Sequence, residues 1–99
     1  MKKQNKIFLS GPITGDPDYQ KKFNRAEWVL LGEGWDVVNP AGRCPKRWPW
    51  WRCMIRCLRL IAGCGWVAML PGWSMSRGAS IEHGVAKLLK KEVVYLGEL

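Results

Sequence analysis

Four short apolar segments constrain the fold of this chain more than any other feature of its sequence. Each is nearly continuous in apolar residues and is bounded by Gly, Pro or Asn, which is typical of strands buried on both faces. They span residues 6–10, 35–39, 66–70 and 93–96. Between them, apolar residues recur at helical spacing, so helices are expected at about residues 16–32, 51–62 and 79–91.

This alternation predicts an α/β chain with a flavodoxin-like three-layer fold, in which a four-stranded parallel sheet of order 2-1-3-4 carries helices on both faces. The 99 residues fit one domain, so residues 1–99 are expected to fold together. In that order the first and third strands are neighbours, and ligands bind outside the carboxyl ends of such strands. The loops at residues 10–15 and 71–78 are therefore expected to border one cleft.

Side-chain patterns within the expected helices predict their caps and their buried faces. Asp16 is typical of an N-cap, with Pro17 at the first helical position. Helical spacing turns these residues toward the core: Tyr19, Phe23, Ala26 and Leu30 in the first helix, Met54, Leu58 and Ile61 in the second, and Ile81, Val85, Leu88 and Leu89 in the third.

Positive charge is concentrated in the middle of the chain. The formal net charge is +8, and no acidic residue occurs between Asp36 and Glu82. A solvated basic face explains this run, and attraction of phosphorylated ligands or nucleic acid is the functional alternative. The basic residues of the stretch are Arg43, Lys46, Arg47, Arg52, Arg56, Arg59 and Arg77.

Tryptophan is strongly over-represented, with seven residues in the chain. A chain this short buries only about 60–65% of its unfolded surface, so one core cannot take up all seven and a homo-oligomer is expected. The run from Trp48 to Trp51 lies between Arg47 and Arg52. Its composition favours a pocket wall or a subunit interface, and a surface that stacks nucleic-acid bases is the less favoured alternative.

The cysteine and histidine residues predict neither a metal site nor a bound cofactor. Cys44, Cys53, Cys57 and Cys64 contain no C-x-x-C pair, and His83 is the only histidine. Free thiols in a reducing compartment are therefore expected. No apolar run reaches the roughly 18 residues of a membrane span, and the one near the start is too short for a secretory signal, so the cytoplasm is the expected location.

Glu82 is the main candidate for catalysis. It lies one turn into the third expected helix, and Gly78 and Ala79 have no side chain that could complete a capping box with it. We expect its carboxylate to face the cleft, to stay ionised near the helix end and to act as a nucleophile. His83 points about 100° away around the helix, so it is expected to serve packing.

The two loops at the expected cleft supply candidate ligand contacts. Ser76 and Gly78 precede a helix N-terminus that suits a phosphate, with Arg77 alongside to steer it, although Ser76 also fits a simple N-cap. The first loop matches neither the Walker pattern nor G-x-G-x-x-G, so neither ATP nor a dinucleotide is indicated. Its candidate nucleotide contacts are Ser10, Gly11, Ile13 and Gly15.

Four stretches together resemble the nucleoside 2-deoxyribosyltransferase superfamily, and most closely its small members in phages and prophages. They are IFLSGPITG at 7–15, VNPA at 38–41, MLPGW at 69–73 and SRGASIE at 76–82. The resemblance covers nearly the whole chain. It implies cleavage or transfer of the N-glycosidic bond of a (deoxy)nucleoside or its 5′-monophosphate.

The resemblance also assigns roles to individual residues. The family glutamate that matches Glu82 attacks C1′ of the sugar, and the Ser-x-Gly that matches Ser76 and Gly78 binds the 5′-phosphate, while the first loop closes over the nucleotide. A retaining glycosyl transfer does require a carboxylate nucleophile beside an oxocarbenium-like centre.

The chain departs from the family at two acidic positions, which are occupied by Cys57 and Gly65. The first of these family aspartates helps to recognise or protonate the base, so activation of the leaving group is in question. Two alternatives to an enzyme are therefore kept. One is a catalytically lapsed nucleotide-binding or protein-binding phage accessory module, and the other is a basic nucleic-acid-binding protein.

Overall fold

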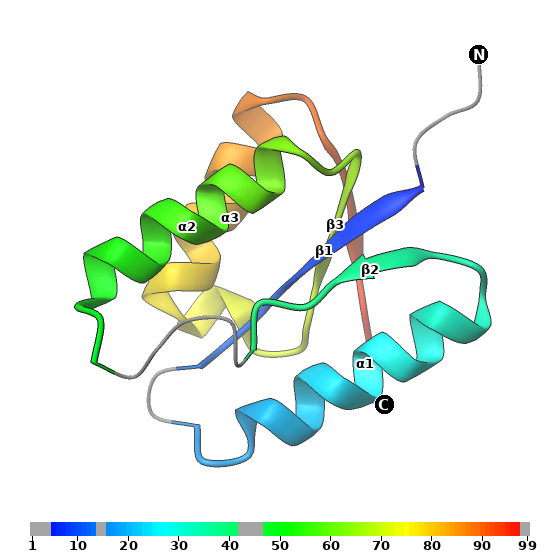
Figure 1. Ribbon diagram of the computed structural model, residues 1–99, viewed down its shortest axis with the longest axis horizontal. Coiled ribbons are helices and arrows are strands. Elements are labelled where there is room, and N and C mark those ends of the chain that lie inside the picture. Colours follow the sequence, from blue (N-terminus) through cyan, green and yellow to red (C-terminus); the bar gives the residue numbers. More distant parts are fainter. Residues whose placement is uncertain (1–4, 14–15, 42–46, 98–99) are drawn as a thin grey trace.

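A four-stranded parallel sheet forms the centre of the molecule (Figure 1). The computed structural model describes residues 5–13, 16–41 and 47–97. The strands are β1 (Lys6–Ser10), β2 (Asp36–Val38), β3 (Trp66–Met69) and β4 (Glu92–Tyr95), in the order β2-β1-β3-β4. This order and the parallel pairing confirm the predicted flavodoxin-like α/β fold.

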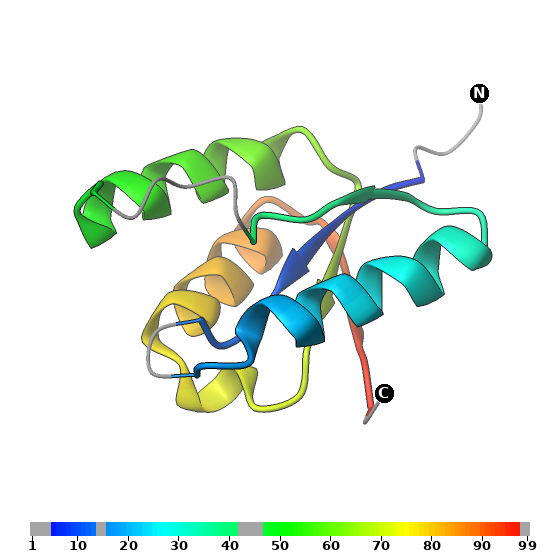
Figure 2. The same ribbon diagram turned by 60° about the horizontal axis from the view of Figure 1, so that its bottom comes forward.

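Helices cover both faces of the sheet (Figures 1 and 2). Helix α1 (Tyr19–Gly32) lies on one face, whereas α2 (Trp50–Ala62) and α3 (Arg77–Leu88) lie side by side on the other. A short 3-10 helix, η1 (Trp73–Met75), precedes α3. The alternating side chains of β1 divide the core, since Ile7 and Leu9 pack with α1 and Phe8 packs with Ile61 of α2 and Ala86 of α3. In α2, Met54 and Ile61 are buried as predicted.

The register of β1 and β3 brings their carboxyl ends level. Ser10 pairs with Met69, and the backbone N–H of Leu70 donates to the carbonyl oxygen of Ser10 at 2.7 Å. The next residue, Gly11, has no room for a side chain, because a Cβ there would lie 2.8 Å from the Cβ of Leu70. The two loops therefore leave the sheet in contact with each other, as the strand order predicts.

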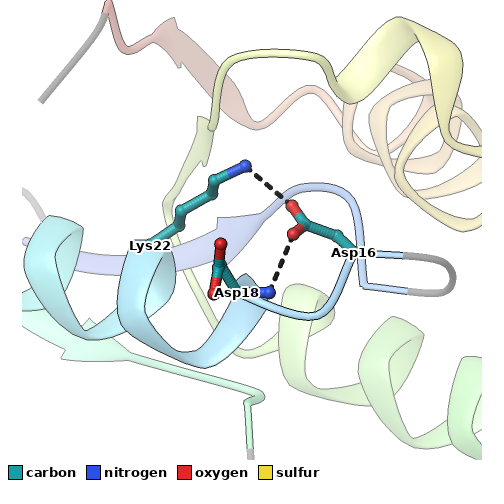
Figure 3. Close-up of polar contacts among 3 residues, drawn as sticks. All are labelled: Asp16, Asp18 and Lys22. Carbon is teal, nitrogen blue, oxygen red and sulfur yellow. Dashed lines mark hydrogen bonds and ion pairs between the residues drawn. The ribbon is translucent and has the colours of Figure 1, made fainter.

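The start of α1 differs from its prediction. Asp16 is not the N-cap; Asp18 is, and it makes no side-chain capping bond. The Asp16 carboxylate instead accepts a bond from the backbone N–H of Asp18 at 2.9 Å and pairs with Lys22 at 2.8 Å (Figure 3). These contacts hold the pKa of Asp16 below its usual value. Asp16 thus closes the turn ahead of the helix, and the helix begins at Tyr19.

Helix α3 buries a different face from the one predicted. The inward residues are Ala79, Glu82 and Ala86. Of the side chains expected in the core, Leu88 is 80% exposed, Ile81 and Leu89 are also exposed, and Val85 is half-buried. Small side chains let the helix approach the sheet closely, and the polar contacts of Glu82 fix its rotation.

The described part of the chain contains no helix whose length and apolar character would suffice to cross a bilayer.

Candidate functional site

A cleft of about 740 Å³ opens at the carboxyl ends of β1 and β3, where the sequence predicts it. One wall comes from the first loop and α1, through Ile13 and Tyr19. The opposite wall comes from the starts of α2 and α3, and Glu82 lies on it. This volume falls within the 300–1,000 Å³ that is typical of small-molecule sites.

Glu82 reaches the cleft from the second turn of α3 and is 7% exposed. Its Oε1 accepts a hydrogen bond of 2.6 Å from the hydroxyl of Ser10, at the end of β1. A second side-chain hydrogen bond joins the carboxyl group to Cys57 of α2. Elements far apart in the chain therefore fix this carboxyl group, while it still borders the cleft.

Burial raises the pKa of Glu82 to about 7, and the hydrogen bonds of Ser10 and Cys57 oppose that rise. The prediction that the helix end keeps this carboxylate ionised therefore overestimates the effect of the helix end. The helix N-terminus contributes about 0.3–1 kcal/mol at exposed sites, which is less than the cost of burying a charge. At neutral pH the protonated and ionised forms of Glu82 are both well populated.

Ser10 is fully buried behind Glu82 and does not line the cleft. We expected it to contact a nucleotide directly, but its hydroxyl is bonded to the carboxyl group instead. Ser10 therefore lies where it can orient the Glu82 side chain.

Cys57 is the partner of Glu82 that faces the cleft from α2. Burial, followed by the nearby carboxylate of Glu82, raises the pKa of its thiol to about 12. The thiol is therefore protonated at neutral pH and can donate to Glu82. Sequence reasoning identified this position as a free thiol and a lost acid but did not connect it with Glu82, although its spacing from Met54 and Ile61 places it on the inward face of α2.

The start of α3 is arranged as an ordinary capped helix that also borders the cleft. The Ser76 Oγ accepts a 3.3 Å bond from the backbone N–H of Ala79, which confirms the N-cap interpretation. Ser76, Arg77 and Gly78 all line the cleft. A Cβ on Gly78 would lie 3.4 Å from the Sδ of Met54, within van der Waals contact, so the start of α3 lies against α2 at this point.

Two tryptophans form the outer wall of the cleft, as the pocket-wall interpretation of the Trp48–Trp51 run predicts. Trp48 and Trp50 both line it. The guanidinium of Arg77 lies 4.7 Å from the centroid of the Trp50 ring, and that of Arg52 lies 4.1 Å from the centroid of Trp48. Arg77 is therefore at the cleft, as expected, but rests on an aromatic face.

The remaining candidate residues differ in whether they reach the cleft. Gly11 and Ile13 line the cleft, and Gly15 lies outside the described residues. His83 serves packing, as predicted: its ring stacks on Trp73 at 4.2 Å, and its Nε2 lies 2.8 Å from the hydroxyl of Tyr95.

The cysteines only partly follow the expectation of free thiols. Cys57 and Cys64 are free, but Cys53 is disulfide-bonded, and Cys44 lies outside the described residues. Spacing alone could not reveal this bond, because a disulfide depends on which cysteines the folded chain brings within reach of each other. Across the described ranges, no group of three or more His, Cys, Asp or Glu side chains could hold a metal ion.

Residues 5–95 match the family model described as a domain of unknown function, DUF4406. The chain belongs to this family. No curated protein matches the DUF4406 chain.

Solved structures share the fold of this DUF4406 chain. A CMP N-glycosidase from Clostridium botulinum, BcmB, is 23% identical with a TM-score of 0.60, over 91% of this chain and 66% of that one. A 2-deoxyribosyltransferase from Leishmania mexicana is 19% identical with a TM-score of 0.69, over 93% and 63% of the two chains. The DUF4406 chain therefore spans slightly less than two thirds of the length of these structures, and at such identities the likeness establishes the fold.

Proposed function

We propose that this chain cleaves or transfers the N-glycosidic bond of a (deoxy)nucleoside or nucleotide, with Glu82 as the nucleophile. One observation carries the proposal: a buried carboxyl group, held by Ser10 and Cys57, borders a cleft of about 740 Å³ at the switch point of the sheet. Proteins that share the fold are named for chemistry on this bond, which supports the same class of substrate.

In the proposed reaction, the ionised Oε of Glu82 attacks C1′ of the sugar and the C1′–N bond breaks. The electron pair leaves with the base, which takes up a proton from water. The sugar is then held as an ester of Glu82, and water or the nitrogen of a second base releases it with retention of configuration. The hydrogen bonds from Ser10 and Cys57 hold the carboxyl group beside the cleft, which favours attack from a fixed position.

We further propose that the start of α3 holds a 5′-phosphate. Ser76 and Gly78 place backbone N–H groups of the first helical turn beside the cleft, and Arg77 adds a positive charge. Gly11, Ile13 and Gly15 of the first loop are proposed to cover the sugar and base.

Chromatographic detection of free base tests the chemistry. Wild-type protein incubated with deoxynucleosides and their 5′-monophosphates should release one base preferentially. Glu82→Gln keeps the shape of the side chain but removes the nucleophile, so release should stop while nucleotide binding remains.

Glu92→Gln is the matched control, because Glu92 is exposed on β4 and should leave base release unchanged. Turnover that persists in Glu82→Gln would overturn the proposed mechanism.

A second candidate function is a binding module that retains the cleft without turnover. The observation that favours it is Cys57, which stands where an acid would assist the leaving base, while Glu82 is the one carboxyl group among the described cleft residues. General acid catalysis typically contributes 10²–10⁴-fold. Saturable nucleotide binding by wild-type protein without base release would favour this candidate.

Self-association is also proposed. Exposed apolar side chains at α3 and β4 offer a surface for it, with Leu88, Leu89 and Tyr95 at 80%, 45% and 55% exposure.

We also propose that the protein is located in the cytoplasm and belongs to the small phage and prophage members of the superfamily. The free thiols of Cys57 and Cys64 support a reducing compartment, and the disulfide of Cys53 argues against one. Counting the free thiols of this protein in rapidly alkylated cells distinguishes a reducing compartment from an oxidising one.

A further inference from the structure

Three arginine side chains lie against the two tryptophans that line the cleft, and one of the three, Arg77, also lines the cleft itself. Arg52 and Arg56 approach Trp48, with guanidinium carbons 4.1 and 5.9 Å from the ring centroid. Arg77 lies over Trp50 at 4.7 Å. We call Arg52, Arg56 and Arg77 the arginine rim.

The arginine rim is not neutralised by carboxylates. No acidic residue occurs from 37 to 81, and no ion pair that the described residues make with one another involves these three arginines. Arg52 and Arg56 also lie four residues apart on α2, where two like charges destabilise a helix. A cation–π contact balances part of this cost, and an anion would balance more.

Two positions for phosphate follow from this arrangement. The first is the start of α3, with Ser76 and Arg77. The second is the Arg52–Arg56 pair, which lies against Trp48 of the cleft wall and is not itself among the residues that line the cleft. Because α2 and α3 run side by side and their starts meet between Gly78 and Met54, both positions lie at the same end of the molecule (Figure 1).

We propose that the arginine rim selects nucleotides with a chain of two or more phosphates, with the phosphate nearest the sugar at the start of α3 and the terminal phosphate at Arg52 and Arg56. This inference rests on the proposed function, because it names the substrate class of the same cleft. Arg is well suited to the role, since its planar guanidinium binds phosphate oxygens in pairs while its face stacks on an indole.

A nucleoside polyphosphate fits the rim better than a nucleic-acid strand does. Single strands bind along grooves in which successive bases stack on open aromatic faces. Here guanidinium groups already lie over Trp48 and Trp50, so these rings are not open faces on which successive bases could stack.

Calorimetric titration with the four common deoxynucleoside monophosphates and triphosphates, in magnesium-free buffer, tests the proposal. Wild-type protein should bind the triphosphate of its preferred base at least about tenfold more tightly than the monophosphate, since the added phosphates would form charge-assisted hydrogen bonds with Arg52 and Arg56. The double variant Arg52→Gln, Arg56→Gln should lose roughly tenfold or more in triphosphate affinity and less than about threefold in monophosphate affinity.

Arg59→Gln is the matched control, because it removes the same charge from an exposed position of the same helix and Trp48 is not its partner. It should leave both affinities unchanged. Circular dichroism melts verify that the variants are folded.

Equal affinity of the wild-type protein for both ligands would overturn the proposal, as would equal losses for both ligands in the double variant. A single-stranded oligonucleotide that binds more tightly than the triphosphate would overturn it in favour of a nucleic-acid surface. These readouts do not depend on turnover. Rim-dependent triphosphate binding without base release would therefore refute the proposed chemistry and retain the binding site.

Discussion

The Glu82 carboxyl group combines two requirements that oppose each other. A nucleophile must be ionised, but burial of the Glu82 carboxyl group raises its pKa to about 7. The hydroxyl of Ser10 and the thiol of Cys57 lower that pKa by donating hydrogen bonds to the ionised form. The pKa of Glu82 is therefore set by burial, which raises it, and by Ser10 and Cys57, which lower it and for which the sequence predicts other roles.

Removing the hydroxyl of Ser10 should raise the pKa of Glu82 further. In Ser10→Ala, the ionised carboxylate loses a 2.6 Å bond, so the acidic limb of a base-release profile should move to higher pH. Carbon-13 NMR of the glutamate carboxyl groups checks the same shift without turnover. Ser80→Ala removes a hydroxyl that contacts the backbone of Trp73 and Ser74, and it should leave the titration in place. An unmoved titration in Ser10→Ala would refute the positioning role.

Glu82 should also make the folded state less stable as pH rises. Its folded pKa of about 7 lies above the ordinary value of 4.5, so the folded chain binds more protons than the unfolded chain between these values. Stability from this group is complete below about pH 4.5 and is lost as pH rises through 7.

Urea unfolding of wild type and Glu82→Gln at pH 5 and pH 8 measures this effect. Because glutamine does not titrate, the wild type should lose about 2–3 kcal/mol relative to the variant between the two pH values. If the difference in unfolding free energy between wild type and variant is the same at pH 5 and pH 8, Glu82 is ionised at both pH values and the prediction is wrong.

The position of Glu82 could be predicted from the sequence, and its protonation state could not. A carboxylate in the second turn of a helix that Ser76 caps, after a buried strand, must lie near the carboxyl edge of the sheet. Its burial depends on the neighbouring helix, since Cys57 reaches it from α2 and is 25 residues away in the chain.

At the scale of elements, α3 buries a different face from the one that its apolar residues predict. Its large apolar side chains indicate one buried face, but the structure turns the small residues Ala79 and Ala86 inward together with Glu82. Close approach to the sheet and the bond to Ser10 outweigh the burial of leucines near the end of the helix. The alanines can be read from the sequence, but the short distance between α3 and the sheet follows only from the packing of the whole fold.

Ala86→Leu should destabilise the fold by about 1–3 kcal/mol, because Ala86 is fully buried against β-strand side chains and the added carbons have no space. Lys87→Leu places the same side chain at the next, exposed position and should change the free energy of unfolding by about 0.5 kcal/mol or less. Thermal and urea unfolding measure both. The opposite ranking would show that α3 is rotated toward the face predicted from its leucines.

At the scale of the whole molecule, the order of strands and the placement of the cleft follow from the sequence, because continuous apolar strands alternating with helices admit few topologies. Local features were less predictable. The turn at Asp16 and the disulfide of Cys53 depend on contacts that spacing does not encode.

Self-association is a prediction at this scale. Sedimentation of wild-type protein at micromolar concentration should show a species larger than 11.3 kDa, because Leu88 and its exposed neighbours on α3 and β4 would gain burial in a second copy. Leu88→Glu should shift the distribution toward the monomer, whereas Lys90→Glu, a charge change beyond the helix end, should shift it less. A wild-type protein that sediments only as a monomer would contradict the prediction.

The central position of β1 has a consequence for how the chain is made. Its outer neighbour β2 and its covering helix α1 leave the ribosome soon after it, so Ile7 and Leu9 find partners early. On the opposite face, Val38 of β2 is also made early, but Ile61, Val67 and Ala86 in the cluster of Phe8 follow some seconds later at about 5–20 residues per second. The half of the core that contains Phe8 is thus the last to assemble. A nascent chain that stalls before α3 can hold a partly formed sheet with an exposed phenylalanine, and chaperones that recognise such surfaces would meet it at that stage.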